Sequence, residues 1–437
     1  MRVLKFGGAA LRDGPAIVRA ARIVRVRGGD RPLVVVSAHE GVTALLDRAL
    51  EDALSGTLSF DPLRVRHRTI LRQLELPGDF LDRYLSELRG VLGLLCDERR
   101  PDRRLRDHVL SFGERMSARV FAAILRREGC EATPMDAFDL GLVSHGGSLE
   151  HPERAAPLLS SAVREARGVA VVTGFLALDD AGHVTTLGRN GSDLTAAWFA
   201  AALGAEEVQL WKEVPGLLTA DPRLVPHARH VPEIGWAEAE ELARHGAQVL
   251  HPGALEPAAR ARIPVRLLDV HDPEGPGSRV AGETGPRGPL AIAHRSRLTR
   301  LCVRLDATRE RAAHLTEILS ALSAQALDPY LGRIGAGWFE ALVPEEPRLG
   351  RVVEELGPEA RIEGTFASVA VVGPGVAQDA RVEAGLRQVA GEIDAPVSFE
   401  PPEPLGRSRV LIAPGEVLAP LVTRVHEAFF DSALLAR

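Results

Sequence analysis

Met1-Arg2-Val3-Leu4-Lys5-Phe6-Gly7-Gly8 opens the sequence and joins an apolar, strand-like run directly to a glycine pair. After a strand, glycines allow backbone N–H groups to approach a phosphate, and a lysine can neutralise the phosphate oxygens. We therefore interpret Lys5, Gly7 and Gly8 as a candidate phosphate-binding loop. A plain Gly-Gly turn after an edge strand, with a surface lysine beside it, is the alternative.

The same alternation of strands and helices continues along the chain. Up to about residue 295, short β-branched runs alternate with longer Ala-, Leu- and Arg-rich segments. This pattern predicts an α/β domain with a mainly parallel sheet sandwiched by helices. The expected strands are Arg2–Phe6, Pro32–Ser37, Gly168–Thr173, Glu207–Trp211 and Pro264–Leu268.

A helix is expected at Asp193–Leu203, where an aspartate near the start precedes an alanine-rich run. It follows a polar, glycine-punctuated loop, Thr185-Thr186-Leu187-Gly188-Arg189-Asn190-Gly191-Ser192-Asp193. In that loop Arg189 can hold a carboxylate through two parallel hydrogen bonds, and Asp193 can orient a lysine by charge. A capped loop with a structural Arg–Asp pair is the alternative, and spacing does not exclude it.

A domain boundary is expected near His271–Pro289, because this stretch is too rich in Gly and Pro to continue a helix or a central strand. We therefore divide the chain into domains of residues 1–295 and 296–437. The second region offers two similar α+β blocks, each resembling a βαββ unit, although two unrelated small pieces remain possible. The blocks pair strand Leu301–Leu305 with helix Arg309–Leu322, and strand Ser368–Val372 with helix Ala380–Val389.

The composition narrows the class of protein. The 437 residues, 45% hydrophobic and 26% charged, suit an enzyme of two or three domains. The longest apolar stretches, such as Leu33–Ala38, fall far short of the ~20 residues of a transmembrane helix. A net charge of -6 without basic clusters argues against nucleic acid as the main partner. We therefore expect small-molecule ligands and neither a membrane nor a nucleic acid.

The cysteines and the start of the sequence bear on the compartment. Cys96, Cys130 and Cys302 are scattered and lack CxxC spacing, so neither a disulfide framework nor a zinc site is expected. The first residues resemble a strand and not a signal peptide. Both observations favour the cytoplasm.

Lysine is almost absent from the chain. Of 53 basic residues, only Lys5 and Lys212 are lysines. A compact ammonium makes a single-point phosphate contact that a planar guanidinium does not reproduce. We therefore expect a chemical role for both lysines, although chance survival of two lysines is the alternative.

Several segments together resemble the aspartate kinase family, in its order and at its usual spacings. The resemblance covers residues 1 to about 270, and LGRNGSD and TADPR set it above other amino-acid kinases. The matching segments are KFGG, SAHEGVT at Ser37–Thr43, SFGE at Ser111–Glu114, TGF at Thr173–Phe175, TTLGRNGSD, WKEVPGLLTADPR at Trp211–Arg223 and GAQVLHP at Gly246–Pro252. The two C-terminal blocks stand where that family carries its pair of regulatory ACT domains.

The resemblance implies an amino-acid kinase fold followed by tandem ACT-like domains, and transfer of the ATP γ-phosphoryl group to the side-chain carboxylate of L-aspartate. It implies catalytic roles for Lys5 and Asp193, and the scarcity of lysine leads us to expect a catalytic role for Lys212 as well. The residues implied around aspartate are Thr43, Glu114, Phe175, Thr186, Arg189 and Ser192. Those implied around ATP are Lys5, Gly7, Gly8, Ser37, Lys212, Glu213, Leu218, Asp221, Arg223 and Gln248.

Charge logic agrees with these roles, because Arg189 suits the α-carboxylate of aspartate and Glu114 suits its α-ammonium. Phosphoryl transfer asks mainly for positioning and charge neutralisation, so no general base is expected. No protein metal site is expected besides the Mg²⁺ that ATP brings. The family also implies a homodimer or higher homo-oligomer through the ACT-like region.

The sequence departs from the family at several positions. Ala9 and Ala10 replace the usual Thr-Ser, Glu213 replaces an aspartate, and Gln248 stands where many members have a lysine. A loose anionic transition state profits from cations on both flanks, so Lys212 is a candidate substitute for the lysine missing at Gln248. A surface lysine beside the pocket is the simpler alternative.

Three further polar residues support weaker hypotheses. His251 is expected to be a capping or buried hydrogen-bonded histidine and not a base. His39 and Glu40 are expected to form a solvated loop pair.

Two other functions remain open at this point. One is a kinase for another small amino acid or carboxylate. The other is a catalytically weak paralogue that binds nucleotide or amino acid as a regulatory subunit, which Ala9, Ala10 and Gln248 motivate.

Overall fold

The computed structural model describes residues 1–100, 102–145, 148–188, 190–247, 252–282, 285–306, 310–402 and 406–431. The chain divides into two compact units. The first unit comprises Met1–Leu217, Pro232–Glu240 and Val249–Thr284, and the second comprises Leu218–Val231, Glu241–Gln248 and Gly285–Arg437. The division passes through helix α8 (Trp236–Arg244).

The first unit is built on an eight-stranded sheet in the order β12-β14-β13-β9-β1-β2-β6-β3. Pairings along its centre are parallel, and β13 with β14 is antiparallel, so the prediction of a mainly parallel sheet is confirmed. The strands are β1 (Arg2–Phe6), β2 (Leu33–Val36), β3 (Ala132–Met135), β6 (Val169–Thr173), β9 (Glu207–Lys212), β12 (Glu233–Ile234), β13 (Val265–Asp269) and β14 (Ser278–Val280).

Strand β1 lies inside this sheet between β9 and β2, where Lys5 pairs with Leu210 and Val35. Successive side chains of a strand point to opposite faces of the sheet. Leu4 and Phe6 belong to an apolar core that includes Ile17 of α1 and Phe121 of α5. Lys5 therefore points to the other face, on which α7 covers β1.

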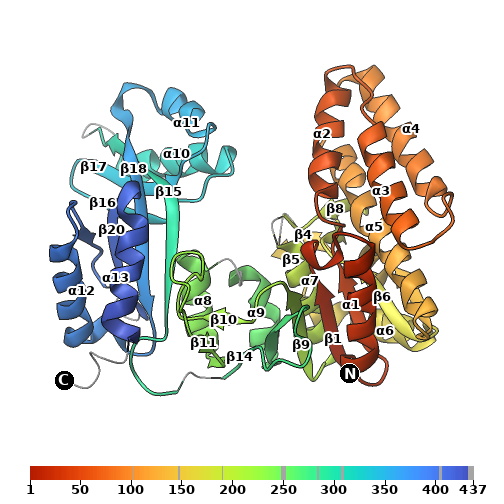
Figure 1. Cartoon of the computed structure of the whole chain (residues 1–437). Coiled ribbons are helices and arrows are strands. Elements are labelled where there is room, and N and C mark those ends of the chain that lie inside the picture. Colours follow the sequence, from red (N-terminus) through yellow and green to blue (C-terminus); the bar gives the residue numbers. More distant parts are fainter. Residues whose placement is uncertain are drawn as a thin grey trace. The chain divides into compact units, whose positions relative to one another are not determined.

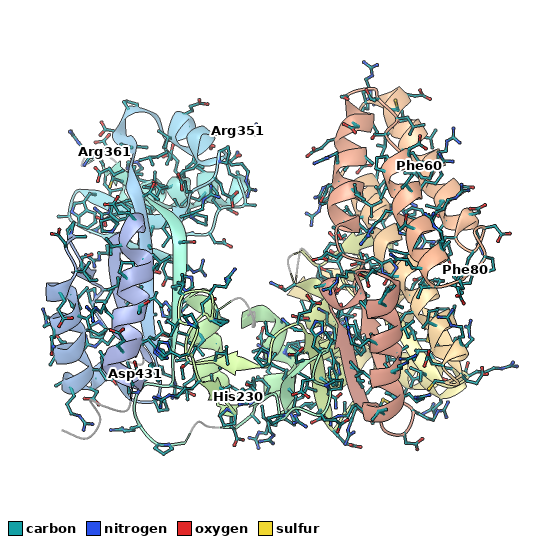
Figure 2. The ribbon with its side chains drawn as sticks, in the orientation of Figure 1. Phe60, Phe80, His230, Arg351, Arg361 and Asp431 are labelled. Atoms are coloured by element: carbon teal, nitrogen blue, oxygen red, sulfur yellow. The ribbon has the colours of Figure 1, made fainter. Side chains whose placement is uncertain are left out.

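The helices of the first unit flank the sheet and extend beyond it. Helices α2, α3, α4 and α5 pack on one another as a group, in red to orange in Figure 1. Phe60 and Phe80 lie before and after α3 and pack against the apolar core (Figure 2). The helices are α1 (Gly14–Arg27), α2 (Val42–Leu54), α3 (Asp61–Gln73), α4 (Asp82–Glu98), α5 (Arg103–Arg127), α6 (Pro152–Glu165), α7 (Gly191–Leu203) and α9 (Pro252–Arg260), with 3-10 turns η1 (Ala9–Leu11) and η2 (Ala137–Leu140).

Three short hairpin-like sheets complete the described strands before residue 285. They pair β4 (Ser144–His145) with β5 (Ser148–Leu149), β7 (Leu176–Leu178) with β8 (Val184–Thr186), and β10 (Leu217–Leu218) with β11 (His230–Val231). In the described ranges, no helix has both the length and the apolar character needed to cross a membrane.

The second unit is built on a six-stranded sheet in the order β16-β17-β15-β18-β20-β19. Its helices are α10 (Arg311–Ala324), α11 (Leu349–Leu356), α12 (Ala380–Glu392) and α13 (Leu418–Phe430), with 3-10 turns η3 (Gly357–Glu359), η4 (Val376–Gln378) and η5 (Gly415–Val417). Its strands are β15 (Ala291–Arg304), β16 (Leu331–Ile334), β17 (Trp338–Pro344), β18 (Ala360–Val372), β19 (Ser398–Phe399) and β20 (Ser408–Pro414).

Two long central strands, β15 and β18, join the halves of this sheet. One half packs α10 and α11 beneath Leu301 and Val303, and the other packs α12 and α13 beneath Ile292 and Val371. Each half continues from its central strand as βαββα, so the expected repeat is present. The expected blocks are not separate, however, because β15 has 14 residues and β18 has 13, long enough to serve both halves. Arg297, at φ +54, lies where the register of the two strands shifts.

The expected secondary structure is found with small changes at the ends. Strand β1 matches its prediction, and α7 begins two residues earlier than expected, at Gly191. Residue 295, where the sequence placed the domain boundary, lies within β15. The second compact unit begins its long C-terminal part at Gly285, inside the Gly- and Pro-rich stretch.

Candidate functional site

A cavity of about 350 Å³ opens in the first unit, beyond the C-terminal ends of β1, β2 and β6. Parallel sheets bind ligands at this edge because the loops and helix starts that follow the strands converge there. The cavity is lined by Lys5, Gly8, Ser37, Ala38, His39, Glu40, Gly41, Thr43, Glu114, Phe175, Gly188, Asn190, Gly191 and Ser192. It brings together most of the side chains predicted for phosphate and aspartate.

Two helices begin at this cavity, each after a residue in the left-handed conformation. Gly41 precedes α2 at φ 80, and Asn190 precedes α7 at φ 60; among the described residues, no side chain caps either start. The backbone also comes close at Gly8, where an added Cβ would lie 3.0 Å from the carbonyl oxygen of Ala38. Helix starts carry partial positive charge, so this wall suits an anionic ligand.

Three charged side chains form the core of the site. The carboxylate of Asp193 lies between two ammonium groups, with Oδ1 2.6 Å from Lys5 Nζ and Oδ2 3.1 Å from Lys212 Nζ. Burial by itself would raise the pKa of Asp193, but the two lysines outweigh burial and hold that pKa well below its usual range. Burial, with Lys5 nearby, lowers the pKa of Lys212 despite its bond to Asp193. Asp193 is thus an ionised carboxylate shared by two lysine side chains.

Glu114 is the buried acid of the cavity. Its Oε1 accepts a hydrogen bond from the backbone N–H of Ala38 at 2.9 Å, while the buried Oε2 has no protein partner among the described residues. Burial raises the pKa of Glu114 to about 7, although the Ala38 bond and the charge of Lys5 oppose the shift. An unpartnered carboxylate oxygen on a cavity wall provides an acceptor for a cationic ligand group.

Thr186 does not line the cavity. Its hydroxyl donates to Asp107 Oδ1 at 2.9 Å, and the hydroxyl of Thr185 donates to Asp107 Oδ2 at 2.9 Å. Asp107 is buried, so these bonds fix β8 against α5. The structure therefore gives Thr186 a supporting contact, and a direct contact with aspartate stays a prediction.

Phe175 is held on the cavity wall by the first turn of α7. It adopts φ +66, and its N–H donates to Thr195 Oγ1 at 3.1 Å, while the Thr195 hydroxyl donates to the carbonyl of Gly191 at 2.8 Å. A side chain at Gly191 would meet the ring of Phe175 at 3.0 Å. The loop before α7 is thus set by close packing.

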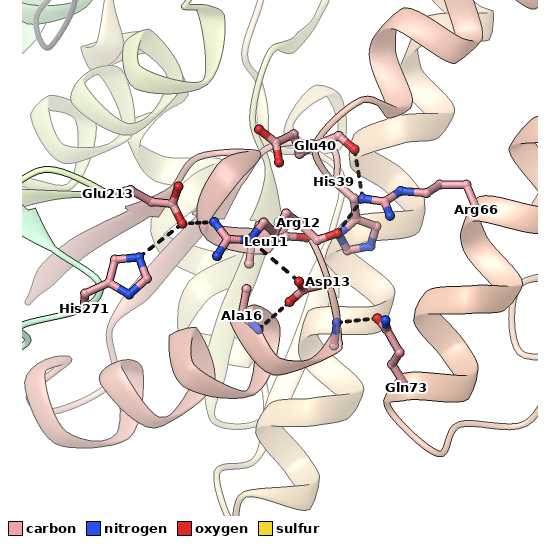
Figure 3. Close-up of polar contacts among 11 residues, drawn as sticks. Leu11, Arg12, Asp13, Ala16, His39, Glu40, Arg66, Gln73, Glu213 and His271 are labelled. Carbon is pink, nitrogen blue, oxygen red and sulfur yellow. Dashed lines mark hydrogen bonds and ion pairs between the residues drawn. The ribbon is translucent and has the colours of Figure 1, made fainter. Parts of the chain in front are cut away.

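Glu213 lies beside η1 in a network of its own, drawn in Figure 3. Its Oε1 accepts a hydrogen bond from the guanidinium of Arg12, and His271 Nε2 lies 3.3 Å from the same oxygen. Arg66 donates from α3 to the carbonyls of Arg12 and Glu40, at 2.5 and 3.1 Å. The network therefore joins the ends of β1, β9 and β13. Its central residue, Glu213, directly follows Lys212 in the sequence.

The expectation of a solvated His39–Glu40 pair is wrong for His39. Glu40 is exposed, but His39 is buried and donates from Nδ1 to the carbonyl of Leu11 at 2.9 Å. Burial, with His67 nearby, lowers the pKa of His39 to about 3. A neutral imidazole thus anchors the phosphate-side loop to η1.

Ala9 and Ala10 are not among the described residues of the cavity wall. Ala10 is buried in the apolar core beneath β1. The loss of a hydroxyl at Ala10 is therefore a change within the core.

The remaining predicted residues lie elsewhere. Leu218, Asp221 and Arg223 belong to the second unit, where Arg223 Nη2 pairs with Asp221 at 2.7 Å. Arg189, Gln248 and His251 lie outside the described residues. Gly7 sits beside the cluster, since a Cβ there would be 3.5 Å from Lys5 Nζ.

Sequence reasoning missed some supporting residues. Asp107 and Arg12 gave no local signal, because their partners are 79 and 201 positions away. Gly41 and Asn190 were detectable in principle, since both residue types favour the left-handed conformation before a helix.

Comparisons with known proteins place this geometry in context. Residues 1–269 match the model of the amino acid kinase family. Aspartokinase 1, chloroplastic, of Arabidopsis thaliana is 36% identical over 293 residues, which cover 64% of this chain and 51% of the relative. Lysine-sensitive aspartokinase 3 of Escherichia coli is 36% identical over 291 residues, 64% of each chain. The chain thus spans about half to two thirds of the length of these relatives.

Solved structures match over nearly the whole chain. E. coli aspartokinase III in complex with aspartate and ADP has a TM-score of 0.83 at 29% identity, covering 99% of this chain and 100% of that one. Clostridium acetobutylicum aspartate kinase has a TM-score of 0.77 at 21% identity, covering 98% and 100%, and this second match bears on the fold alone.

Proposed function

The chain belongs to the amino acid kinase family, and from this membership we propose that it is an aspartate kinase, which transfers the γ-phosphoryl group of ATP to the side-chain carboxylate of L-aspartate. The amino-acid kinase fold followed by a tandem ACT-like region, predicted from the sequence, is confirmed. The observation that carries the proposal is the buried Lys5–Asp193–Lys212 cluster beside a cavity that also holds Glu114.

The reaction needs little covalent help from the protein. A carboxylate oxygen of aspartate attacks the γ-phosphorus, the bond from that phosphorus to the β,γ-bridging oxygen breaks, and ADP leaves with the electron pair. The products are 4-phospho-L-aspartate and ADP, and no proton has to move. Catalysis then depends on alignment and on cations beside the oxygens where charge develops.

Residues on the phosphate side of the cavity have matching roles in the proposal. Lys5 and Lys212 contact the transferred phosphoryl group, and Asp193 holds both ammonium groups in position. The starts of α2 and α7 and the close backbone approach at Gly8 supply further positive charge. Ser37 lines the same wall.

On the aspartate side, Glu114 accepts the α-ammonium through its unpartnered Oε2. Arg189 holds the α-carboxylate through two parallel hydrogen bonds. Thr43, Phe175 and Ser192 close the wall around the substrate. This ammonium-binding acid distinguishes a free amino acid from an N-acylated one.

Mg²⁺ accompanies ATP in this proposal. The described cavity wall offers Glu40 and Glu114 as acids, and Asp193 is already paired with two lysines, so phosphates and water would supply most ligands of the ion. The nucleotide side, with Glu213, Leu218, Asp221, Arg223 and Gln248, stays a prediction.

Assembly and location complete the proposal. We place the contacts of a homodimer or higher homo-oligomer in the ACT-like region. A reducing compartment such as the cytoplasm suits the three free cysteines.

The decisive assay uses purified protein with ATP, Mg²⁺ and one acceptor at a time. Aspartate, glutamate and N-acetylglutamate are compared, and the acyl phosphate is trapped with hydroxylamine. We expect product with aspartate. Nucleotide binding without any acyl phosphate would instead support the regulatory paralogue, and product with another acceptor alone would identify a different amino-acid kinase.

A further inference from the structure

Three side chains of the kinds that bind metal ions, two histidines and one aspartate, come together in the second unit at the end of α13. His227, His426 and Asp431 each direct one ligand atom into a group whose members are all within 4.8 Å of one another. Asp431 directly follows α13 (Figure 2), and His227 comes from the segment Leu218–Val231. His227 Nε2 already lies 3.7 Å from Asp431 Oδ2.

His426 has one nitrogen engaged and one open. Its Nε2 lies 2.9 Å from Thr219 Oγ1, whereas its Nδ1 is buried and has no hydrogen-bond partner among the described residues. Thr219 Oγ1 also accepts from the N–H of Arg229 at 2.9 Å, and it can accept a second bond from Nε2–H. In that tautomer Nδ1 carries a lone pair, as a metal ligand requires.

The surroundings of His426 resemble those of a metal-bound histidine. A metal-ligating imidazole almost always donates its other N–H to a fixed acceptor, which sets the ring orientation. Here Thr219 provides the acceptor, and the ring of His426 also stacks on Phe430 with centroids 5.0 Å apart. A buried imidazole nitrogen without a partner is costly, and a cation would satisfy it.

The donor atoms are held on a packed frame. Ala220 and Val225 of the segment that carries His227 belong to the same apolar cluster as Leu421 and Val425 of α13. The fixed ligand is therefore the fully buried His426, and the adjustable ligand is His227, whose side chain is 54% exposed.

We propose that His227, His426 Nδ1 and Asp431 form a binding site for a first-row divalent cation of the Zn²⁺ type. Two imidazoles and one carboxylate suit this class of metal, and a solvent molecule completes the fourth position on the open side. Bonds of about 2.0–2.2 Å place neighbouring ligand atoms about 3.4 Å apart in a tetrahedron. The present ligand atoms lie within 4.8 Å of one another, so binding requires them to move closer, through rotation of the partly exposed side chains of His227 and Asp431.

The charged groups nearest the three ligands are the Asp431 carboxylate itself and the guanidinium of Arg229. Arg229 Nη2 lies 3.9 Å from Asp431 Oδ1, whereas His227 Nε2 lies 3.7 Å from Oδ2, so a cation would bind on the Oδ2 side, away from the guanidinium. A bound cation would tie α13 to the segment Leu218–Val231 within this unit.

The test is a titration of metal-free full-length protein with Zn²⁺ by calorimetry, without nucleotide. We expect one equivalent to bind, and we expect His227→Ala and Asp431→Asn each to weaken binding by at least about tenfold. Both positions are accessible, so these variants should fold; His151→Ala, at a histidine with a 76% exposed side chain in the first unit, is the matched control. Thermal stability should rise with Zn²⁺ in the wild type and the control and much less in the two variants.

Cobalt substitution distinguishes the proposed ligands from cysteine. Co²⁺ bound by nitrogen and oxygen gives visible d–d absorption without intense thiolate bands. Thiolate bands, the lack of a bound equivalent, or unchanged affinity in both His227→Ala and Asp431→Asn would overturn the proposal.

Discussion

Asp193 holds the only two lysines of the chain in one buried cluster. The scarcity of lysine pointed to chemistry, but the sequence did not show that both ammonium groups meet the same carboxylate. Because Asp193 is buried and ionised, it directs both lysine side chains to one place, while burial lowers the pKa of Lys212. Arginine at either position would present a fork where the cluster accommodates a point charge.

Lys212→Ala tests the role of the second cation. We expect kcat to fall about 100-fold with little change in the KM for aspartate, because charge develops mainly on the phosphoryl oxygens. Lys212→Arg should also be impaired. Steady-state kinetics with both substrates varied provide the measurement, and a wild-type kcat in Lys212→Ala would leave Lys5 as the only lysine the reaction needs.

A double change examines whether Lys212 compensates for Gln248. Lys212→Thr with Gln248→Lys moves the ammonium group to the position where many members of the family have a lysine. We expect it to recover kcat relative to Lys212→Thr alone. Equal kcat values in the single and double variants would show that the two positions do not share one electrostatic task.

Glu114 predicts a pH dependence for aspartate. Burial raises its pKa from 4.5 to about 7, so the acid is largely protonated below that pH and cannot accept the substrate ammonium as an ion. We expect kcat/KM for aspartate to fall up to tenfold per pH unit below about 7, with a much flatter profile in Glu114→Gln. An identical acid limb in the wild type and Glu114→Gln would assign the titration to another group.

The raised pKa of Glu114 also determines how the stability of the fold changes with pH. A raised pKa in the folded state means that the contribution of Glu114 is fully present below about 4.5 and is lost as the pH rises through about 7. Glu114→Gln should therefore raise the melting temperature at pH 8 more than at pH 5.

Arg189→Ala should raise the KM for aspartate far more than the KM for ATP. A charge-assisted pair lost from a substrate pocket should cost ~2–4 kcal/mol of transition-state binding. Arg189→Lys is a useful comparison, because it keeps the charge and loses the two-bond geometry. Equal losses for both substrates would remove Arg189 from the aspartate site.

At the scale of elements, a buried polar chain crosses the second unit. Ser368 donates to the hydroxyl of Tyr330 at 3.2 Å, so the Tyr330 proton points to His245 Nδ1 at 2.6 Å. His245 then carries its proton on Nε2, which faces Glu241 and Ser408 at 3.2 and 2.9 Å. This direction of donation satisfies both nitrogens of a buried imidazole and fixes the end of α8 to the sheet strands β18 and β20.

Tyr330→Phe should destabilise the second unit by about 1–3 kcal/mol, because it leaves a buried nitrogen of His245 without a donor. The aromatic ring beneath Arg295, 4.4 Å from its guanidinium carbon, is retained. Ser368→Ala is the control. It should cost less stability, because it removes only the bond from Ser368 to Tyr330 and leaves the bond between Tyr330 and His245 in place. Calorimetric unfolding gives both values. Equal melting profiles of Tyr330→Phe and the wild type would show that this series of hydrogen bonds does not stabilise the second unit.

At the scale of the whole molecule, the two compact units interleave along the sequence. Ala220 and Val225 pack in the core of the C-terminal unit although they precede it by about 60 residues. Thr219 likewise accepts the N–H of Ile292 at its carbonyl oxygen, at 2.7 Å. A truncation after residue 295 would also cut β15.

A truncation after residue 284 follows the boundary of the compact unit. We expect it to lose oligomer stability, because the ACT-like region supplies the oligomer contacts in our proposal, and any feedback response, because the family resemblance makes this region regulatory. The segment Leu218–Val231 would lose its apolar partners, so the KM for ATP should rise if Leu218, Asp221 and Arg223 serve the nucleotide. Light scattering and inhibition assays with lysine and threonine measure the outcome; an unchanged oligomer with unchanged inhibition would give the C-terminal region another task.

Local patterns in the sequence were enough for the parallel sheet, the loop after β1 and the start of α7. Alternation of apolar runs, glycines and helix starts is a short-range property that the chain carries within a few residues. Family resemblance added the identity of several cavity residues, including Glu114 and Ser192.

Long-range packing settled the rest. The pairing of Lys5 and Lys212 through Asp193 joins positions 19 to 207 apart, and the contacts of Glu213 and Thr186 depend on Arg12 and Asp107 in distant elements. The continuous sheet of the second unit depends on β15 meeting β18, which no local pattern encodes. Burial of His39, and with it the neutral state of its imidazole, follows from α3 covering the loop, because desolvation is a property of the folded surroundings and not of the residue.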